Sequence, residues 1–413
     1  MSLHLSMLFL STRFLFPSDS GGKIRTCDVL RGLKGGQFNI TLVSPEPPNS
    51  KNYANDLEQV CDRFLGWPER SGGYRHSIRR FLNLFSTLPV SVATDRSALV
   101  ARFLVDELGA GHDLVVIDFP HAAIFIPAKV SIPTIVFTHN VESEIYKRHA
   151  DISNSFFRFL YRDQCRKMLR YERTILENSD EVIAVTERDR KFFETEFGLK
   201  HVSEIPTGVD LGEFSYRPPG QGFNGQGSPA LVFVGSMDWH GNIDAITYFM
   251  DHVWPLISAH RKDLEFLIVG RNPPQDLIKR ARDRNLPWTF TGFVDDVRHY
   301  VYRSLVYVIP LRVGSGSRIK AYQAMALGCP VVSTTIGIEG LLLTPGEHYL
   351  HADSPNDFAE AILRLVDNPG IRQTLSECAY RFIADRFSAV QVAQEFEQIC
   401  LRTVDRVGQR QRH

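Results

Sequence analysis

Two series of short apolar runs dominate the chain, and each run is followed by a loop signal and a segment with helical periodicity. The first series is LSMLFLS, ITLVSP, LVVIDF, TIVFTH, EVIAVT and SEIPTG, and the second is LVFVGS, EFLIVG, WTFTG, LVYVIP and PVVSTT. Short runs rich in β-branched and aromatic residues, without polar alternation, are typical of parallel strands that helices cover on both faces. The pattern therefore predicts an α/β protein with two doubly wound, Rossmann-like domains.

A segment rich in Gly, Pro and Gln, YRPPGQGFNGQGSPA, separates the two series and contains almost no apolar residues. We therefore assign residues 1–210 to the first domain, 211–229 to a linker and 230–387 to the second domain. Residues 388–413 have helical periodicity and no strand after them, which indicates a C-terminal helix and tail that could return to the first domain. Ligands of doubly wound sheets bind beyond the carboxyl ends of the strands, so a cleft in which the two domains face each other is the expected active site.

The composition excludes several other classes of protein. Lys and Arg together number 47, as do Asp and Glu, so no bulk charge favours nucleic acid as a partner. The six cysteines include no C-x-x-C pair, which argues against a zinc site and a disulfide framework and fits a reducing cytoplasm. The opening MSLHLSMLFLSTRFLFP lacks a basic start and is interpreted as a first strand rather than a signal peptide. The most apolar later stretch contains Asp118, His121 and Lys129, so no transmembrane helix is predicted.

The segment PLRVGSGSRIKAYQAMALGCPVVS carries the strongest chemical signal. A permissive loop follows the strand LVYVIP and consists of Gly314, Ser315, Gly316 and Ser317. Ser317 is a suitable N-cap for the helix that follows, and Arg318 and Lys320 lie in its first turn. Positive side chains are unfavourable there because the helix dipole is positive at that end. A bound diphosphate, held by backbone N–H groups and both cations, would compensate them.

Two motifs in the first domain also follow strands. Gly21 and Gly22 lie where a helix should begin, which allows close approach of a ligand to the backbone, although the segment matches neither the dinucleotide-binding nor the P-loop pattern. In THNVESE, His139 lies at a strand end, where a histidine can hydrogen-bond a substrate hydroxyl or act as a general acid or base. Glu142 follows in the first turn of a helix, a position that the helix dipole alone favours.

The PLRVGSGSRIKAYQAMALGCPVVS segment and its continuation resemble the donor-binding segment of the family-4 retaining glycosyltransferases of GT-B fold, in particular a bacterial branch associated with exopolysaccharide. Further matching motifs occur in the family's order and cover nearly the whole chain: SGGKIR, THNVE, YERTILENSDEVIAVTERD, IPTGVD, FVGSM, FLIVGRNP and TGFVDDV. The resemblance implies transfer of a sugar from a nucleotide-sugar, such as a UDP- or GDP-sugar, to a saccharide or lipid-linked acceptor with retention of configuration. The first domain would lie on the acceptor side, and the second would bind the donor.

The resemblance also implies roles for individual residues. His139 would contact the transferred sugar, and Arg318 and Lys320 would neutralise the leaving diphosphate. Gln323 would face the ribose. Donor-binding positions would further include Gly21, Gly22, Gly235, Arg271, Phe293 and Val294, together with Gly314, Ser315, Gly316 and Ser317. Such enzymes need no protein nucleophile, because stabilising the departing phosphate is the main task.

The chain departs from the family pattern at two places. The family's two glutamates, seven residues apart, correspond to Ser315 and Gln323, and FVGSMDWHGNIDA lacks the usual Arg and Lys. We hypothesise that Arg318 and Lys320 substitute for those cations. No two Asp residues are separated by a single residue, so neither a metal site nor a cofactor beyond the donor is expected. A non-catalytic nucleotide-sugar-binding homologue and a nucleotide-sugar 2-epimerase stay open as alternatives.

Two segments mix aromatic with basic residues, YRHSIRRFLNLF and SFFRFLYRDQCRKMLRYER. Such helices could touch anionic lipid, which would place the cytoplasmic protein peripherally at the inner face of a membrane. Amphipathic helices with solvated basic faces and aromatic core residues explain the same pattern.

Overall fold

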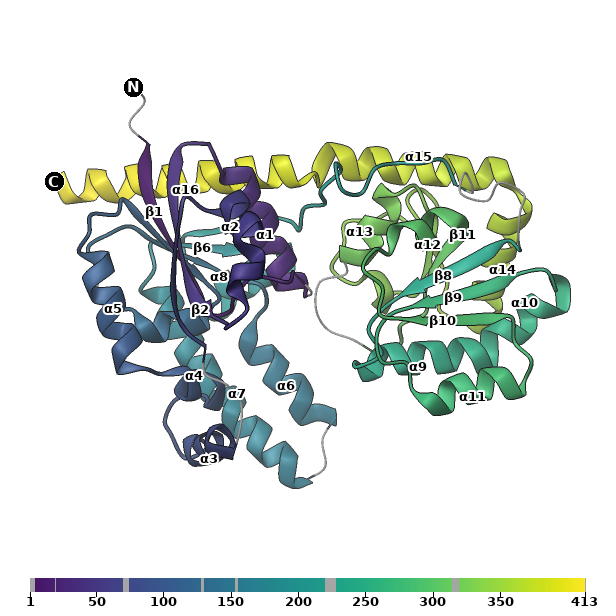
Figure 1. The fold of residues 1–413 in the computed structure, drawn as a ribbon, viewed down its shortest axis with the longest axis horizontal. Helices are drawn as coiled ribbons and strands as arrows, with labels where there is room; N and C mark the ends of the chain where they lie inside the picture. Colours follow the sequence, from purple (N-terminus) through teal and green to yellow (C-terminus); the bar gives the residue numbers. More distant parts are fainter. Residues whose placement is uncertain are drawn as a thin grey trace. The chain divides into compact units, whose positions relative to one another are not determined.

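The structure is a computed structural model that describes residues 4–18, 20–69, 74–127, 130–152, 155–219, 228–313 and 319–412. The chain forms two compact units, each built on a parallel sheet (Figure 1). Unit 1 comprises residues 1–208 and 389–413, and unit 2 comprises residues 209–388. The prediction of two Rossmann-like domains is confirmed.

Unit 1 contains a sheet with the strand order β3-β2-β1-β4-β5-β6-β7. Its strands are β1 (Leu5–Ser11), β2 (Phe38–Glu46), β3 (Arg63–Pro68), β4 (Leu114–Asp118), β5 (Thr134–Phe137), β6 (Glu181–Ala184) and β7 (Val202–Glu204). Its helices are α1 (Gly21–Leu33), η1 (Ser50–Tyr53), α2 (Ala54–Val60), α3 (Tyr74–Asn83), α4 (Val90–Asp95), α5 (Ala98–Leu108), η2 (Pro120–Phe125), α6 (Glu142–Ile152), α7 (Ser155–Glu177), α8 (Glu187–Glu196) and α16 (Ala389–Arg412). The strand order reverses direction between β1 and β4, which is where ligands of such sheets bind.

The central strands of unit 1 place apolar side chains on both faces of the sheet. Met7 and Phe9 of β1 pack in one core cluster, while Leu8 and Leu10 pack in another, as the alternation of side chains along a strand requires. Helix α16 contributes Phe396 to the first of these clusters. A Cβ atom at Gly32 of α1 would overlap the side chain of Ala393, so the two helix backbones approach closely.

Unit 2 contains a sheet with the order β10-β9-β8-β11-β12-β13, reversing between β8 and β11. Its strands are β8 (Ala230–Val234), β9 (Glu265–Val269), β10 (Trp288–Gly292), β11 (Ser304–Ile309), β12 (Val331–Ser333) and β13 (Leu350–His351). Its helices are α9 (His240–Tyr248), η3 (Phe249–Val253), α10 (Trp254–His260), α11 (Gln275–Asp283), α12 (Arg298–Arg303), α13 (Ile319–Ala326), η4 (Ile336–Ile338), α14 (Pro355–Asp367) and α15 (Pro369–Arg386).

Several details differ from the predicted pattern or extend it. Strands β3 and β13 were not predicted, because β3 is a half-exposed edge strand and β13 has two residues. The run SEIPTG contributes to the sheet only through its first two residues, Ser203 and Glu204, at the end of β7. Residues 211–219, predicted as linker, include Tyr216, whose ring lies 4.5 Å from that of Tyr380 in unit 2. Among the described helices, none is both long and apolar enough to cross a bilayer.

Candidate active site

The carboxyl edge of the unit 2 sheet gathers polar side chains from consecutive loops. Lys320 lies in the first turn of α13, after β11, and its ammonium donates to the carbonyl oxygen of Val234 at the end of β8, 3.4 Å away. This contact spans the point at which the strand order reverses. The side chain is open to solvent on part of its length. Surrounding protein atoms and the positive charge of Arg271 lower the pKa of Lys320.

Arg271, which follows β9, is held by the loop after β8. Its Nε donates to Asp238 Oδ2 at 2.7 Å and to Ser236 Oγ at 3.2 Å. Asn272 donates to the other carboxylate oxygen of Asp238 at 2.8 Å and adopts a positive φ of 55°. Arg271 and Lys320 are thus near enough to repel each other, a condition that a bound anion would relieve.

A glycine lies at the carboxyl end of three neighbouring strands: Gly235 directly follows β8, Gly270 directly follows β9, and Gly292 is the last residue of β10. A Cβ atom at Gly270 would overlap the carbonyl oxygen of Gly235, and one at Gly235 would lie 2.7 Å from Nδ2 of Asn242. Gly292 has φ of 71° and forms a bridge with Gly270. Close packing therefore explains why residue 235 is a glycine. Its contact with a donor stays a prediction.

The other donor-side residues differ in their exposure. Phe293 is 73% exposed, whereas Val294 is partly buried against the core of unit 2. Gln323 is half-buried on α13, one turn after Lys320. The predicted residues Gly314, Ser315, Gly316, Ser317 and Arg318 lie outside the described residues.

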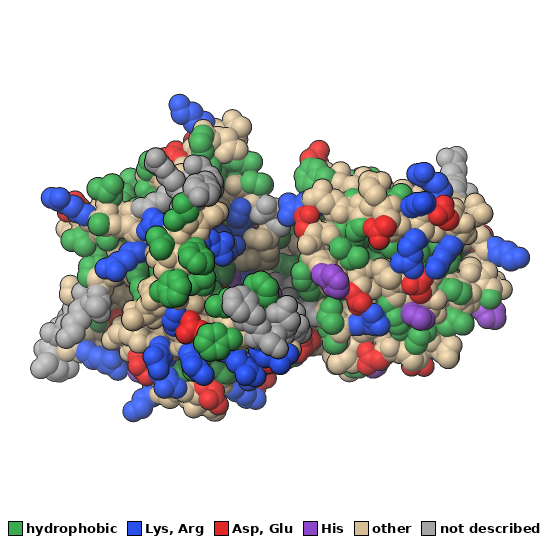
Figure 2. Space-filling view, turned by 90° about the horizontal axis from the view of Figure 1, so that it is seen from below, with side chains coloured by type: hydrophobic (Ala, Val, Ile, Leu, Met, Phe, Trp, Pro, Cys, Tyr) green, Lys and Arg blue, Asp and Glu red, His purple; other side chains and the backbone are tan. Residues whose placement is uncertain are grey.

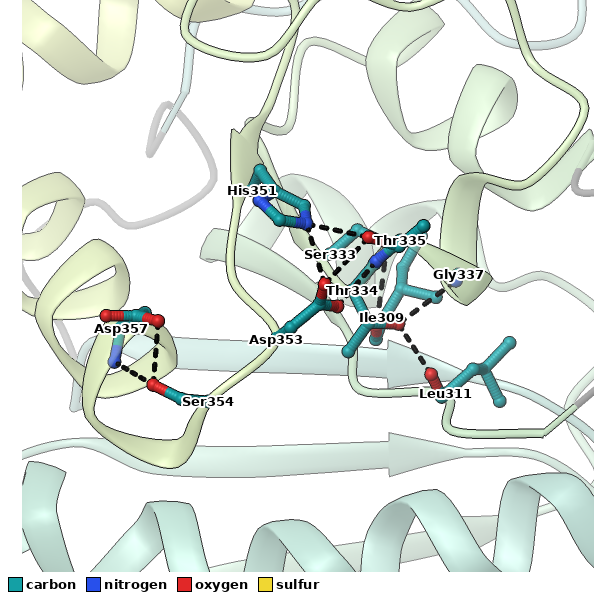
Figure 3. Close-up of polar contacts among 10 residues, drawn as sticks. All are labelled: Ile309, Leu311, Ser333, Thr334, Thr335, Gly337, His351, Asp353, Ser354 and Asp357. Atoms are coloured by element: carbon teal, nitrogen blue, oxygen red, sulfur yellow. Dashed lines mark hydrogen bonds and ion pairs between the residues drawn. The ribbon is translucent and has the colours of Figure 1, made fainter.

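The same edge continues past β12 into a hydrogen-bonded turn (Figure 3). Asp353 accepts hydrogen bonds from the backbone N–H of Thr335 at 2.8 Å and from its hydroxyl at 2.7 Å. His351 lies within hydrogen-bonding distance of both side chains. Thr334 donates to the carbonyl of Leu311 and accepts from the N–H of Gly337, so it joins this turn to the segment after β11.

In unit 1, Gly22 lies in the first turn of α1 against an unusual residue of the loop after β4. A Cβ atom at Gly22 would lie 2.9 Å from Cζ of Phe119. Phe119 itself adopts a φ of 67°, a left-handed conformation that is strained for a bulky residue. Its ring stacks on His139 with centroids 4.0 Å apart. Gly22 is therefore needed for the ring to cover the histidine.

His139 is 3% exposed, and both of its ring nitrogens are hydrogen-bonded. Nε2 donates to Oδ1 of Asp118 at 2.7 Å, and Nδ1 accepts from Nη1 of Arg25 at 2.9 Å. Asp118 also accepts from Ser11 and Thr26. Burial lowers the pKa of His139, Asp118 raises it and Arg25 lowers it further, with a net decrease. The imidazole is therefore neutral, and its contact with a sugar stays a prediction.

Arg25 completes this buried network. The guanidinium is 2% exposed, and its Nε donates to Thr207 Oγ1 at 2.9 Å. Burial lowers the pKa of Arg25 to about 10, although nearby Asp189 and Asp118 oppose the change. We did not predict Arg25, Asp118 or Asp238 as site residues. The available signal was that Asp118 lies near the end of the predicted strand LVVIDF and that Asp238 closely follows the predicted strand LVFVGS.

Comparison with known proteins identifies the family. A family model described as Glycosyltransferase Family 4 matches residues 20–213, and one described as Glycosyl transferases group 1 matches residues 228–368. The chain belongs to the family-4, group 1 glycosyltransferases. This glycosyltransferase is 22% identical over 401 residues to an uncharacterized 44.6 kDa protein in the cps region of Klebsiella pneumoniae, covering 94% of this chain and 97% of the relative. It is 29% identical over 194 residues to a phosphatidyl-myo-inositol mannosyltransferase of Mycolicibacterium smegmatis, covering 46% and 49% of the two chains.

Solved structures of GT-B glycosyltransferases share the fold of this glycosyltransferase. Sucrose-phosphate synthase from Thermosynechococcus elongatus has a TM-score of 0.70 at 18% identity, with 96% of this chain and 98% of that chain covered. HepE of Anabaena, in complex with UDP and glucose, has a TM-score of 0.66 at 15% identity, with 96% and 99% covered. Within the part of the chain that the structure describes, no three His, Cys, Asp or Glu side chains gather as a metal-binding group.

Proposed function

We propose that this glycosyltransferase transfers a hexose from a UDP- or GDP-sugar to a saccharide or lipid-linked acceptor, with retention of configuration, in the synthesis of an exopolysaccharide or cell-surface glycan. The observation that carries the proposal is the pair of cations, Lys320 and Arg271, at the strand-order reversal of unit 2. The similarity to the cps-region protein and the fold shared with the HepE complex with UDP and glucose support it.

The proposed mechanism follows from the charge that develops on the leaving diphosphate. Lys320 and Arg271 offset that negative charge. Arg318, two residues before Lys320 in the sequence, would supply a further positive charge. Side-chain cations make a metal unnecessary for this step. The departing phosphate oxygen takes the proton of the acceptor hydroxyl, which lets the acceptor attack from the same face and retains the configuration.

Nucleotide binding tests the proposal directly. We expect UDP or GDP to raise the thermal stability, because a ligand at ~100 times its dissociation constant adds about 2.7 kcal/mol. The variant Lys320→Ala should bind the same nucleotide at least about 10-fold more weakly, since it loses a charge-assisted hydrogen bond. Lys279→Ala, at an exposed position of α11, is the matched control. An absence of stabilisation by UDP, GDP and ADP would contradict the proposal.

Product analysis distinguishes sugar transfer from the two alternatives, a non-catalytic nucleotide-sugar-binding homologue and a nucleotide-sugar 2-epimerase. Incubation with the stabilising nucleotide-sugar and an acceptor should release the nucleoside diphosphate and form a glycoside whose anomeric configuration, measured by NMR, equals that of the donor. A non-catalytic homologue would bind the donor and release nothing. A 2-epimerase would convert the donor sugar without an acceptor.

A surface formed by α3 and α7 favours the proposed contact with anionic lipid. Phe81 in α3 and Phe85, two residues after α3, are 62% and 80% exposed, and Phe159 on α7 is 70% exposed. The ammonium of Lys167 on α7 donates to the carbonyl of Leu84, so the end of α3 and α7 are adjacent. Exposed arginines recur every four residues along α7, at Arg158, Arg162, Arg166 and Arg170. Figure 2 shows basic and apolar side chains together on this side of unit 1.

Vesicle sedimentation tests this surface. Vesicles that contain phosphatidylglycerol should bind the protein, and vesicles of phosphatidylcholine alone should bind it much less, because each basic residue near an anionic surface contributes about 1 kcal/mol. The double variant Phe81→Ser and Phe85→Ser should lose roughly 10-fold or more of the binding. Leu99→Ser, which changes an exposed leucine of α5, should not. Equal binding by all three proteins would exclude the α3–α7 surface.

A further inference from the structure

A cavity of about 400 Å³ lies at the amino edge of the unit 1 sheet, where the strands begin. Its walls come from the starts of β6 and β7 and from the C-terminal half of α16. Glu181 is the first residue of β6, and Lys200 and His201 directly precede β7. Ligands of doubly wound sheets bind at the opposite, carboxyl edge, where His139 lies. The cavity is therefore separate from the expected active-site edge of unit 1.

Helix α16 presents a row of arginines to this cavity. Arg402 and Arg406 line it, and Arg410 follows after four more residues, which places the three side chains on one side of the helix. Ile399 and Thr403 also line the cavity and are buried. Like charges four residues apart on a helix repel each other. An anion in the cavity would offset that repulsion.

The carboxylate of Glu181, which also lines the cavity, is already used by the protein. Its Oε2 accepts from Nη2 of Arg406 at 2.8 Å, and its Oε1 accepts from Oγ of Ser203 at 2.8 Å. The side chain of Glu181 is 6% exposed. The negative charge of Glu181 therefore balances Arg406 and is not offered to a ligand in the cavity.

Hydrogen-bond donors outnumber acceptors around His201. Nη1 of Arg406 lies 3.1 Å from Nδ1 of His201, and Nη2 of Arg410 lies 3.5 Å from Nε2. A neutral imidazole has one acceptor nitrogen, so it can accept from only one of the two guanidinium groups. Nε of Arg406 is also buried without a hydrogen-bond partner in the described part of the chain. These arginines therefore have more N–H groups than the surrounding protein has acceptors.

Two further cations line the cavity from opposite walls. Lys200 precedes β7 and Arg402 lies on α16, and both are exposed. Neither side chain forms a hydrogen bond or an ion pair with any residue that the structure describes. Since Glu181 balances only Arg406, the positive charges of Lys200 and Arg402 are in excess.

We infer that Lys200, Arg402 and the Arg406–His201 pair form a binding site for a phosphate group. A phosphate oxygen only accepts hydrogen bonds, which matches a site of surplus donors, and its negative charge matches the two surplus cations. The cavity has room for the small molecule that carries the phosphate. A phosphate bound there would connect the end of α16 to the edge strand β7. This site lies outside the proposed sugar transfer, so its failure would not affect that proposal.

Hydrogen exchange of the whole protein, measured by mass spectrometry during a titration with inorganic phosphate, tests the site. At constant ionic strength, phosphate should slow exchange in peptides that cover residues 199–206 and 399–410. Lys200→Gln and Arg402→Gln should each raise the phosphate concentration of half-maximal protection roughly 10-fold or more, because each removes a charge-assisted hydrogen bond. Both residues are exposed, so the folded state should tolerate either change.

Arg102→Gln, at an exposed position of α5, is the matched control and should leave that concentration unchanged. Equal half-maximal concentrations in all three variants, equal protection by chloride, or protection only in unit 2 would overturn the inference. So would a lack of protection by every phosphate probe.

Two further probes identify the source of the phosphate group. UDP represents soluble phosphate esters, and vesicles that contain phosphatidic acid represent lipid headgroups. Protection of the same two peptides by UDP would support a soluble ligand, and protection by the vesicles would support a headgroup. Either result supports the site, provided that Lys200→Gln and Arg402→Gln weaken it.

Discussion

The environment of Glu142 shows how one buried side chain makes stability depend on pH. The folded-state pKa of Glu142 is raised from 4.5 to about 7, chiefly by burial and then by Glu172. The folded state therefore disfavours the ionised carboxyl. Its contribution is most favourable below pH 4.5 and is lost as the pH rises through 7.

The change in the free energy of unfolding from wild type to Glu142→Gln should consequently be more favourable at pH 8 than at pH 5. The difference between the two pH values should approach about 3 kcal/mol, since one pKa unit corresponds to about 1.4 kcal/mol. Urea unfolding of wild type and variant at both pH values measures it. The control Glu144→Gln should show a much smaller pH effect. An equal stability change at pH 5 and pH 8 would show that burial does not act on Glu142 in this way.

At the scale of elements, the close approach of the backbone after β8 to the backbone after β9 requires glycine at position 270. Gly270→Ala would place a Cβ atom against the carbonyl of Gly235, which is backbone and cannot rotate away. We expect a loss of about 1–3 kcal/mol or more in urea unfolding, together with weaker nucleotide binding. Gly408→Ala in α16 meets no atom within 4 Å and should instead stabilise by about 0.5–1 kcal/mol. Unchanged stability of Gly270→Ala would mean that the loops after β8 and β9 adjust freely.

At the scale of the whole molecule, the chain passes between the units twice, after Gly208 and after Ser388. Helix α16 therefore belongs to unit 1, where Phe396 is fully buried and its ring lies 5.3 Å from that of Phe137. Phe396→Ala should destabilise unit 1 by about 3–5 kcal/mol. Hydrogen exchange should show lost protection in β1 and little change in β8. Val390→Ala, at an exposed position of the same helix, is the control. Equal loss of protection in β8 would contradict the assignment of α16 to unit 1 alone.

Sequence patterns predicted the elements whose burial is uniform. Strands β4 and β11 are buried along their whole length, and β1 is buried along its last five residues. Their sequences are therefore mainly apolar and predict buried strands without any tertiary information. The half-exposed edge strand β3 has no such pattern. Lys320 and Arg271 could be predicted as a pair only through the family resemblance, because they are far apart in the chain.

The class of fold, the two successive α/β domains and the family could all be predicted from the sequence, since they depend on local periodicity and on motifs of contiguous residues. The partners of the buried polar groups became known only from the three-dimensional arrangement of the chain. Arg25, Asp118 and His139 come from three separate segments, and their side chains form one buried network in which His139 is neutral and hydrogen-bonded at both ring nitrogens. Glu142 lies in the first turn of α6 as expected, but the carboxylate that accepts its backbone N–H belongs to Glu172, thirty residues later. Burial and partner choice depend on contacts between distant segments, and no local pattern records them.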